Sequence, residues 1–264
     1  MKRSNGLGRT RGFTLSELLT TLGIIGIIAA LTMPTLINNI QKKAWTNQLK
    51  KEYANITQSF KLMLANDNTE SLQETSVFQA ISGENKCFYN NPAEDENCNS
   101  FFNEMRKVLK IADIRNDNNY QYRELKQGSD LITYNDAIIT LLSGVSIFNF
   151  KFYKETIDKK FGCGDGNIFC GNNLYIGEFY LDINGSKGPN TLGKDIFYFM
   201  LSEAGNLYPY ASKGTCSFIC GGNYCYWKNV KDLCGTPNTK DAVKIASGIG
   251  CTARIMENNW VMNY

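Results

Sequence analysis

The feature that most constrains the fold of this chain is an apolar segment of 25 residues near its N-terminus. Residues 13–37 read FTLSELLTTLGIIGIIAALTMPTLI, and Glu17 is the one ionisable residue among them. With a rise of 1.5 Å per residue, a helix of this length extends about 37 Å, which exceeds the ~30 Å hydrocarbon core of a bilayer. The segment is therefore predicted to be a membrane-spanning helix.

Basic residues around this segment predict its orientation. Four of them precede it, namely Lys2, Arg3, Arg9 and Arg11. Because the cytoplasmic flanks of membrane helices are enriched in lysine and arginine, we expect the N-terminus in the cytoplasm and the rest of the chain outside it. Lys42 and Lys43, on the far side, oppose this orientation. The segment is longer than the apolar region of a secretory signal peptide, and it continues directly into a second helical pattern.

Residues 38–65 are predicted to continue the same helix with one apolar stripe. Apolar residues recur there mostly at steps of three or four, namely at Ile40, Trp45, Leu49, Tyr53, Ile56, Phe60 and Met63. Charged residues, mainly lysine, lie between them. This spacing is typical of a helix that packs one face against a globular domain. One long helix is therefore expected, apolar on all sides in its first half and amphipathic in its second.

Glu17 needs a physical explanation, because a carboxylate in an apolar membrane segment costs about 3 kcal/mol unless it finds a partner or reaches the interface. One interpretation is that Glu17, close to the helix start, reaches the headgroups or the positive end of the helix dipole. The other is that it pairs with a positive group. Gly23, Gly26 and Pro34 weaken the same segment, so the helix is expected to bend or loosen locally.

Together, the residues RGFTLSELLTTLGIIGIIAALTMPTL resemble the type IV prepilin signature, in which a short basic leader ends in glycine and precedes FTLSE and an apolar run with a late proline. The resemblance covers about the first 40 residues. It implies that prepilin peptidase cuts after Gly12 and methylates the new N-terminal amine of Phe13. It also implies that Glu17 pairs with the amine of a neighbouring subunit, which neutralises a buried carboxylate, and that Pro34 belongs to the assembly helix.

The same resemblance implies a location and a set of partners. The protein is expected to be a single-pass inner-membrane protein with an extracytoplasmic head, and then a subunit of a type IV pilus or type II secretion pseudopilus. Its implied partners are other pilin or pseudopilin subunits, prepilin peptidase, an inner-membrane assembly platform and membrane lipid. A body of about 200 residues beyond the helix favours a minor subunit. The alternative is a low-copy surface adhesin whose cysteine-rich C-terminal end recognises a ligand.

Composition argues against enzymatic and nucleic-acid-binding functions. The chain contains no histidine, which removes the commonest general base and the commonest metal ligand. Neither a GxxxxGK[ST] nucleotide loop nor a GxSxG nucleophile turn occurs. The net charge of +3 falls to about −1 when the four basic leader residues are set aside. We therefore expect no catalytic residue and no nucleic-acid partner.

Nine cysteines predict disulfides and an oxidising compartment. They are Cys87, Cys98, Cys163, Cys170, Cys216, Cys220, Cys225, Cys234 and Cys251. Zinc is the competing interpretation, but the chain has none of the CxxC pairs that structural zinc sites commonly use. The odd number leaves at least one cysteine unpaired or paired between chains. Spacing does not determine the connectivity, and we expect adjacent pairs, Cys87 with Cys98 and Cys163 with Cys170.

The body of the chain is expected to have an α+β fold. A helix is predicted at 100–111, and strands at 131–134, 137–142, 145–153, 173–183, 194–202 and 206–211, where β-branched and aromatic residues are frequent. An antiparallel sheet packed on the helix stripe is the simplest arrangement. The predicted organisation is a leader (1–12), a membrane or filament-core helix (13–37), an amphipathic helix (38–65), a head (66–211) and a cysteine-rich, disulfide-stapled region (212–264).

The segment LDINGSKGPNTLGKDIFYF supports two interpretations. Asn184-Gly185 between two strand-like runs predicts a hairpin turn. Asp182, Asn184 and Asp195 also place hard oxygen ligands on one loop, as calcium prefers, although an EF-hand pattern is incomplete here. The resemblance adds that some pseudopilins bind calcium in this general region. A plain hairpin and a calcium site therefore both stay open.

The cysteine-rich region likewise has two interpretations. Residues 213–238 contain four cysteines, four glycines and four aromatic residues. Such a segment can be a stapled flap that covers a sheet edge. It can also be an exposed binding surface on which Tyr224, Tyr226 and Trp227 stack against sugars or partner chains. Cys251 is expected to tie the final stretch of the chain back to the body.

Overall fold

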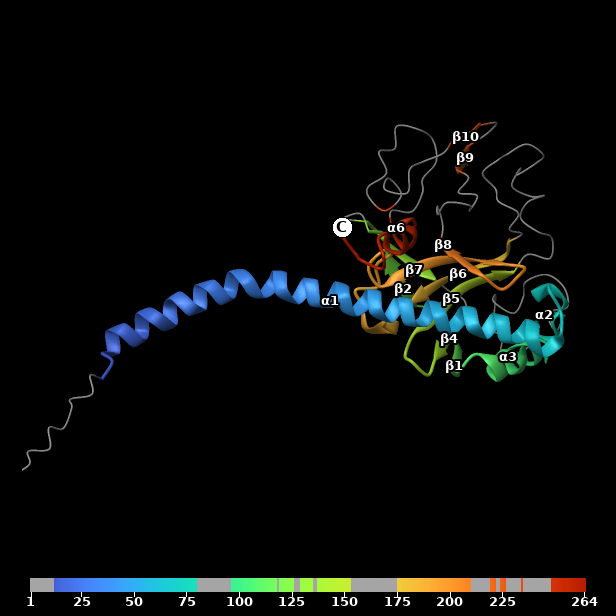
Figure 1. The fold of residues 1–264 in the computed structure, drawn as a ribbon, viewed down its shortest axis with the longest axis horizontal. Helices are drawn as coiled ribbons and strands as arrows, with labels where there is room; N and C mark the ends of the chain where they lie inside the picture. The colour runs from blue at the N-terminus through green and yellow to red at the C-terminus, as the bar shows by residue number, and fades with distance from the viewer. Residues whose placement is uncertain are drawn as a thin grey trace, which may run out of the picture. The chain divides into compact units, whose positions relative to one another are not determined.

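The computed structural model describes residues 12–79, 96–117, 119–125, 129–134, 137–152, 175–209, 219–221, 224–226, 234 and 248–264. The chain divides into two compact units, Met1–Lys42 and Lys43–Tyr264. The second unit is called the head. Figure 1 shows the helices and strands with their labels. The five predicted segment boundaries stay predictions.

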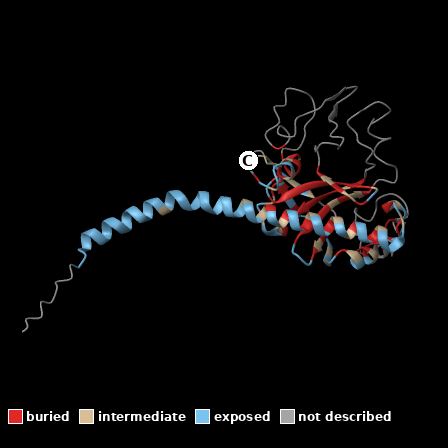
Figure 2. Cartoon of the chain, in the orientation of Figure 1, coloured by how far each residue is buried: buried red, intermediate tan, exposed pale blue. Residues whose placement is uncertain are grey.

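The first unit consists of the start of helix α1, which extends from Leu15 to Asp67 as 53 continuous helical residues with Pro34 inside it. Figure 2 shows this part of α1 as exposed along its length. Its exposed large apolar residues are Leu15, Leu18, Leu19, Leu22, Ile24, Ile25, Ile27, Ile28, Leu31, Met33, Leu36, Ile37 and Ile40. Helix α1 is long and apolar enough to cross a membrane. Ile40, predicted to join the buried stripe, is exposed with this group.

In the head, the second half of α1 buries one face. Leu49, Ile56, Phe60 and Met63 are almost completely buried, and they recur at steps of three, four and seven residues. The amphipathic stripe predicted from the sequence is therefore confirmed for these positions. Burial of each large apolar side chain contributes about 1.5–3 kcal/mol, so this face holds the helix on the head.

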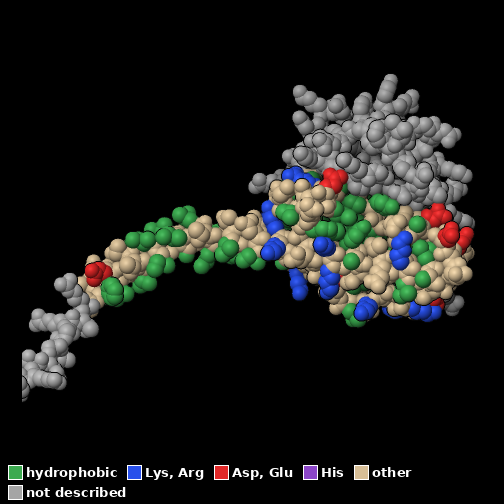
Figure 3. All heavy atoms as spheres, in the orientation of Figure 1, with side chains coloured by type: hydrophobic (Ala, Val, Ile, Leu, Met, Phe, Trp, Pro, Cys, Tyr) green, Lys and Arg blue, Asp and Glu red, His purple; other side chains and the backbone are tan. Residues whose placement is uncertain are grey.

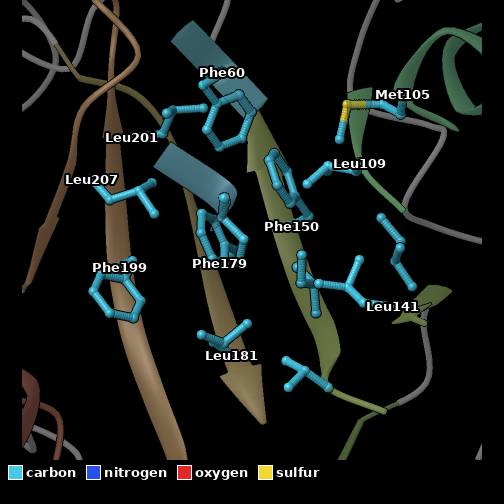
Figure 4. Close-up of a cluster of buried hydrophobic side chains, with 14 of the residues drawn as sticks. Phe60, Met105, Leu109, Leu141, Phe150, Phe179, Leu181, Phe199, Leu201 and Leu207 are labelled. Atoms are coloured by element: carbon cyan, nitrogen blue, oxygen red, sulfur yellow. The ribbon is translucent and has the colours of Figure 1, made fainter. Parts of the chain in front are cut away.

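The helix packs on a six-stranded antiparallel sheet with strand order β1-β4-β5-β6-β7-β8. The strands are β1 (Ile111–Asn116), β4 (Ala137–Leu141), β5 (Ser146–Phe152), β6 (Tyr175–Asp182), β7 (Ile196–Ser202) and β8 (Leu207–Pro209). Figure 4 shows Phe60 of α1 in one cluster with Phe150, Phe179 and Leu201 of the sheet. The rings of Phe150 and Phe179 stack with their centroids 5.1 Å apart.

A second apolar cluster covers the other face of the sheet. It includes side chains of the hairpin formed by β2 (Tyr120–Arg123) and β3 (Leu131–Tyr134), in which Tyr120 pairs with Tyr134. Phe148, completely buried, lies at its centre, with ring centroids 4.7 Å from Tyr120 and 5.3 Å from Tyr180. The sheet is thus buried on both sides, which explains why its central strands are almost continuously apolar.

Short elements complete the described fold. They are η1 (Leu72–Glu74), α2 (Ser76–Gln79), α3 (Glu96–Val108), η3 (Gly185–Lys187), the paired strands β9 (Ile219–Gly221) and β10 (Tyr224–Tyr226), and α6 (Cys251–Glu257). A disulfide joins Cys234 to Cys251 at the start of α6. After α6, Trp260 packs on Tyr53 of α1 with ring centroids 5.4 Å apart. The α+β fold and a stapled C-terminal region are therefore confirmed.

The strands β3 to β8 occupy the predicted positions within two residues at each end. The helix predicted at 100–111 is α3, but it ends at Val108, and Ile111 already begins β1. Strand β1 was not predicted, because the charged residues in IADIRN interrupt its apolar pattern. The turn signal at Asn184-Gly185 lies, as expected, in a loop between two paired strands, β6 and β7, and this loop contains η3.

Candidate functional site

The start of α1 is the first candidate site, and its geometry is a reciprocal capping box. Thr14 directly precedes the helix, and Glu17 lies in its first turn. The backbone N–H and the Oγ1 hydroxyl of Thr14 donate to Glu17 Oε2 at 2.8 and 2.9 Å. In return, the backbone N–H of Glu17 donates to Thr14 Oγ1 at 3.2 Å. This T-x-x-E spacing satisfies backbone donors that the first helical turn otherwise leaves unpaired.

The capping box gives Glu17 a partner inside its own chain. A helix start in hydrocarbon has no water to satisfy its N–H groups, so an acceptor three residues into the helix is valuable there. The carboxylate is thus held by local geometry in a single subunit. The T-x-x-E pattern is visible in the sequence, and sequence analysis overlooked it.

The predicted processing residues lie just before this box. Gly12 is exposed, and no atom lies within 4 Å of the position where a Cβ would stand. Phe13 is 82% exposed. Pro34 lies inside the same helix, in its exposed part. These positions leave the predicted cleavage point open to another protein.

The second candidate site is the loop between β6 and β7, where Asp182, Asn184 and Asp195 come together. Asp182 ends β6, Asp195 directly precedes β7, and both carboxylates are completely buried. The Tyr120 hydroxyl donates to Asp182 Oδ2 at 2.5 Å, and the backbone N–H of Asn184 donates to Oδ1 at 3.2 Å. The three predicted ligand residues are therefore neighbours in the fold, and Tyr120 joins them from β2.

Asp195 organises the rest of the loop. Its Oδ2 accepts the backbone N–H of Asn190 at 2.8 Å, and its Oδ1 accepts that of Thr191 at 2.7 Å. The Asn184 Nδ2 group donates to the carbonyl of Gly188 at 2.7 Å. Each carboxylate thus accepts hydrogen bonds from the loop, which is what a hairpin held by its own side chains requires.

The loop is held from outside as well. The backbone of Arg123 accepts from Leu192 and donates to Asn190, both at 2.8 Å. The Tyr264 hydroxyl donates to the carbonyl of Gly193 at 2.6 Å. Gly193 has a φ of 83°, and a Cβ at that position would lie 2.8 Å from Cys251 Sγ. The loop, the C-terminal tyrosine and the disulfide therefore form one packed unit.

Burial sets the electrostatics of this site. Burial raises the pKa of Asp182 to about 7, the hydrogen bond from Tyr120 opposes this rise, and the charge of Asp195 adds to it. Burial also raises the pKa of Asp195, against the hydrogen bonds from Thr191 and Asn190. Two buried carboxylates whose charges repel each other favour protonation of one of them, or a bound cation, over two free charges.

The oxygen atoms at this site bear on the calcium prediction. Two amide oxygens, Asn184 Oδ1 and Asn190 Oδ1, are buried without a hydrogen-bond partner among the described residues. With the two carboxylates they are the hard oxygen ligands that calcium prefers. The described residues contain no group of three or more histidine, cysteine, aspartate or glutamate side chains suited to a metal. Calcium binding therefore stays a prediction, and the hydrogen bonds fit a hairpin equally well.

Sequence analysis identified three of the residues in this loop and missed Tyr120, because its contact with Asp182 spans 62 positions. The predicted pairs of Cys87 with Cys98 and of Cys163 with Cys170 lie outside the residues described in full. Trp227 also lies outside the described residues, and for Tyr224 and Tyr226 only the backbone in β10 is described. The predicted aromatic binding surface stays a prediction.

Comparison with known proteins finds no family model, no curated protein and no solved structure that matches the chain. The architecture itself is nevertheless distinctive, because one helix is apolar and exposed in its first half and packs on an antiparallel sheet in its second. This architecture is pilin-like. The pilin-like fold joins an N-terminal apolar helix, which has the length of a membrane anchor or signal, to an α+β head.

Proposed function

We propose that the chain is a prepilin-type subunit, cut after Gly12, of a type IV pilus or type II secretion pseudopilus. The observation that carries this proposal is the exposed apolar part of α1, which begins with the Thr14–Glu17 capping box. The thirteen large apolar side chains exposed on this part of α1 must be covered by lipid or by other apolar helices. A filament subunit buries this surface first in the membrane and then against neighbouring copies.

The capping box supports the assembly role of Glu17. In the isolated chain the Glu17 carboxylate accepts hydrogen bonds from Thr14, so the helix start is stable in the membrane without a neighbouring subunit. On assembly, the N-terminal amine of Phe13 in a neighbouring subunit offers a charged partner for the same carboxylate. Because a buried charge must be paired, this contact favours one fixed register between neighbouring helices. Prepilin peptidase and an inner-membrane assembly platform are the further partners that this role requires.

The head supports a structural role, and its size supports a minor subunit. In the described part of the head the sheet is buried on both faces, and a disulfide joins Cys234 to α6, so these residues form one packed core. The chain also lacks histidine, which makes a catalytic role less suitable. The head contains about 200 residues beyond the helix, which suits a low-copy subunit that carries a specialised surface.

The alternative function is a surface adhesin or binding module that uses the same anchor. It is favoured by the aromatic residues in the cysteine-rich region, Tyr224, Tyr226 and Trp227. Under this alternative, changing Tyr224 or Trp227 abolishes attachment to a ligand while filaments still form. Under the main proposal, the same changes leave assembly and its dependent function intact.

The test of the main proposal is the mass of the N-terminal peptide of the protein isolated from its own host. Prepilin processing predicts a chain that begins at Phe13 with one added methyl group. A membrane-resident chain that retains residues 1–12 contradicts the proposal and makes the segment an ordinary signal anchor.

A further inference from the structure

The charges of the chain are distributed unevenly along α1 and the segment after it. Residues 38–65 contain five lysines and one glutamate, a net charge of +4. The described residues that follow, 66–79 and 96–107, contain five carboxylates and two basic residues, a net charge of −3. The sign of the charge therefore changes along the chain, and it separates a basic end of the head from an acidic end.

The basic end is the part of α1 with which the head begins. Lys43, Lys50 and Lys51 are exposed there. Lys51 lies 3.9 Å from the buried carboxylate of Glu52. Among the residues that the structure describes, no carboxylate forms a salt bridge with Lys43 or Lys50.

A hollow adjoins this basic end. It has a volume of about 590 Å³ and lies between α1, the end of α3 and the turn after β4. Lys51 and the exposed Lys110 lie on its border, together with Leu142, which is 71% exposed. A recess with a basic border and an exposed apolar side chain is suited to an acidic element of another protein chain.

The acidic end lies where α1 stops. Asp67 ends the helix, Glu70 and Glu74 follow it, and all three are exposed. The backbone N–H of Leu72 donates to the carbonyl of Glu203 at 2.9 Å, which holds Glu203 of the β7–β8 turn at the same end. On the face drawn in Figure 3, acidic side chains of the head gather at the end where α2 lies.

The two ends cannot neutralise each other within one head. Seventeen residues separate Lys50 from Asp67, which at 1.5 Å per residue is about 26 Å along the helix. This distance is more than twice the Debye length of about 8–10 Å at physiological ionic strength. Two lysines near the acidic end are already engaged. Lys61 donates its Nζ to the backbone carbonyl of Ala204. Lys107, which lines the same hollow as Asp67, pairs with Glu104. The net charges at the two ends are therefore available to another molecule.

We propose that the acidic end of one head, around Glu70, docks on the basic end of the next copy, around Lys50. The proposal rests on the proposed function, because a filament places copies of α1 side by side with an axial offset. The contact joins two different surfaces of the same chain, so it is heterologous, and such contacts build an open helical filament when their rotation does not close a ring. Complementary charge makes the opposite stacking, basic end on basic end, unfavourable and so selects one polarity.

Charge reversal on each side tests the proposal. The variants are Lys50→Glu, Glu70→Lys and the two combined, in the full chain extracted from membranes in a mild detergent. The readout is the oligomeric fraction, measured by size exclusion with light scattering. Because exposed ion pairs contribute up to about 1 kcal/mol, each single reversal is expected to lower the association constant by about threefold or more. The combined variant is expected to recover most of the loss.

The control is Lys187→Glu, which makes the same charge change at an exposed residue of η3, in the loop between β6 and β7. It is expected to oligomerise like the unmodified chain. Raising the salt to about 0.5 M is expected to weaken the unmodified oligomer and to have little effect on the single reversals. The proposal is overturned if the unmodified chain is monomeric, if a single reversal oligomerises normally, or if the combined variant shows no recovery.

The N-terminal mass of the same samples separates this proposal from the proposed function. A chain that keeps residues 1–12 but shows reciprocal rescue contradicts prepilin processing and supports the head contact. A chain that begins at Phe13 and is indifferent to both reversals supports processing and overturns the head contact.

Discussion

Tyr120 and Asp182 lie 62 positions apart in the chain, and in the folded head the Tyr120 hydroxyl donates to Asp182 Oδ2 at 2.5 Å. Tyr120 is 4% exposed and Asp182 is completely buried. The bond joins the β2–β3 hairpin to the end of β6, the strand that leads into the Asp195 loop. One hydrogen bond therefore connects the hairpin that covers one face of the sheet to the candidate cation site.

The first prediction concerns this pair. Tyr120→Phe removes the donor and leaves Asp182 Oδ2 buried without it, so we expect the free energy of unfolding to fall by about 1–3 kcal/mol. Urea unfolding of the full chain in detergent, followed by tryptophan fluorescence, measures the change. Tyr122→Phe on the same strand is the control, because no described group forms a hydrogen bond with its hydroxyl. Equal effects of the two changes would show that only ring packing matters.

The second prediction is a dependence of stability on pH. The pKa of Asp182 is raised to about 7 in the folded head, and that of an unfolded aspartate is about 3.9. The folded state therefore binds the proton more tightly, so stability is highest below the unfolded pKa and falls as pH rises from about 4 to about 7. Asp182→Asn, which carries no titrating proton, is expected to flatten this slope of melting temperature against pH. An unchanged slope in the variant contradicts the assignment to Asp182.

The third prediction concerns calcium. If Asp182, Asn184 and Asp195 bind the ion, added calcium raises the melting temperature of the full chain at neutral pH, and a chelator reverses the rise. At a calcium concentration a hundred times the dissociation constant, the added stability is about 2.7 kcal/mol. Asp195→Asn is expected to abolish the rise. A melting temperature that does not respond to calcium or to chelator leaves the hairpin as the only role of this loop.

The fourth prediction concerns the capping box. Glu17→Ala is expected to insert into the membrane and be cut normally but to assemble poorly, because both the cap and the partner for a neighbouring amine are lost. Thr14→Ala keeps the carboxylate and removes the hydroxyl, which weakens the helix start by about 1 kcal/mol and lowers assembly less. Ser16→Ala, which lies between them, is the control. Filament yield is the measurement, and a normal yield from Glu17→Ala contradicts the assembly role.

The fifth prediction compares two glycines with similar backbone geometry. Gly193 and Gly144 have φ values of 83° and 81°. A Cβ on Gly193 meets Cys251 Sγ at 2.8 Å, whereas no atom lies within 4 Å of the same position on Gly144. Alanine at either position strains the backbone, and only Gly193→Ala also displaces the disulfide. We expect Gly193→Ala to be more destabilising by about 1–3 kcal/mol in thermal unfolding. Equal losses would show that the contact with Cys251 is unimportant.

Much of the secondary structure could be predicted because its signals are local. The stripe of Leu49, Ile56, Phe60 and Met63 follows helical periodicity, and the β-branched and aromatic runs correspond to β3 through β8. Strand β1 was missed because Asp113 and Arg115 break its pattern at an exposed sheet edge, where charged residues are common. The capping box was also local, and its T-x-x-E spacing was sufficient to predict it.

The candidate cation site could be predicted only in part from local sequence signals. The oxygen-rich composition of the loop was visible in the sequence, and so was the hairpin alternative. The burial of both carboxylates was not visible, because it depends on β2 and on the C-terminal residues Cys251 and Tyr264, which come from two distant parts of the chain. The pairing of Cys234 with Cys251 was likewise undetermined by spacing, since nine cysteines allow many connectivities.

The sequence by itself determined that the chain has an apolar N-terminal helix, an amphipathic continuation and an antiparallel α+β head. These properties follow from transfer free energies and from periodicities that are summed over neighbouring residues. Only the tertiary structure decided that Tyr120 meets Asp182 and that Gly193 lies against Cys251. Such contacts depend on the order of strands and on which face each element buries, and no window of neighbouring residues contains that information.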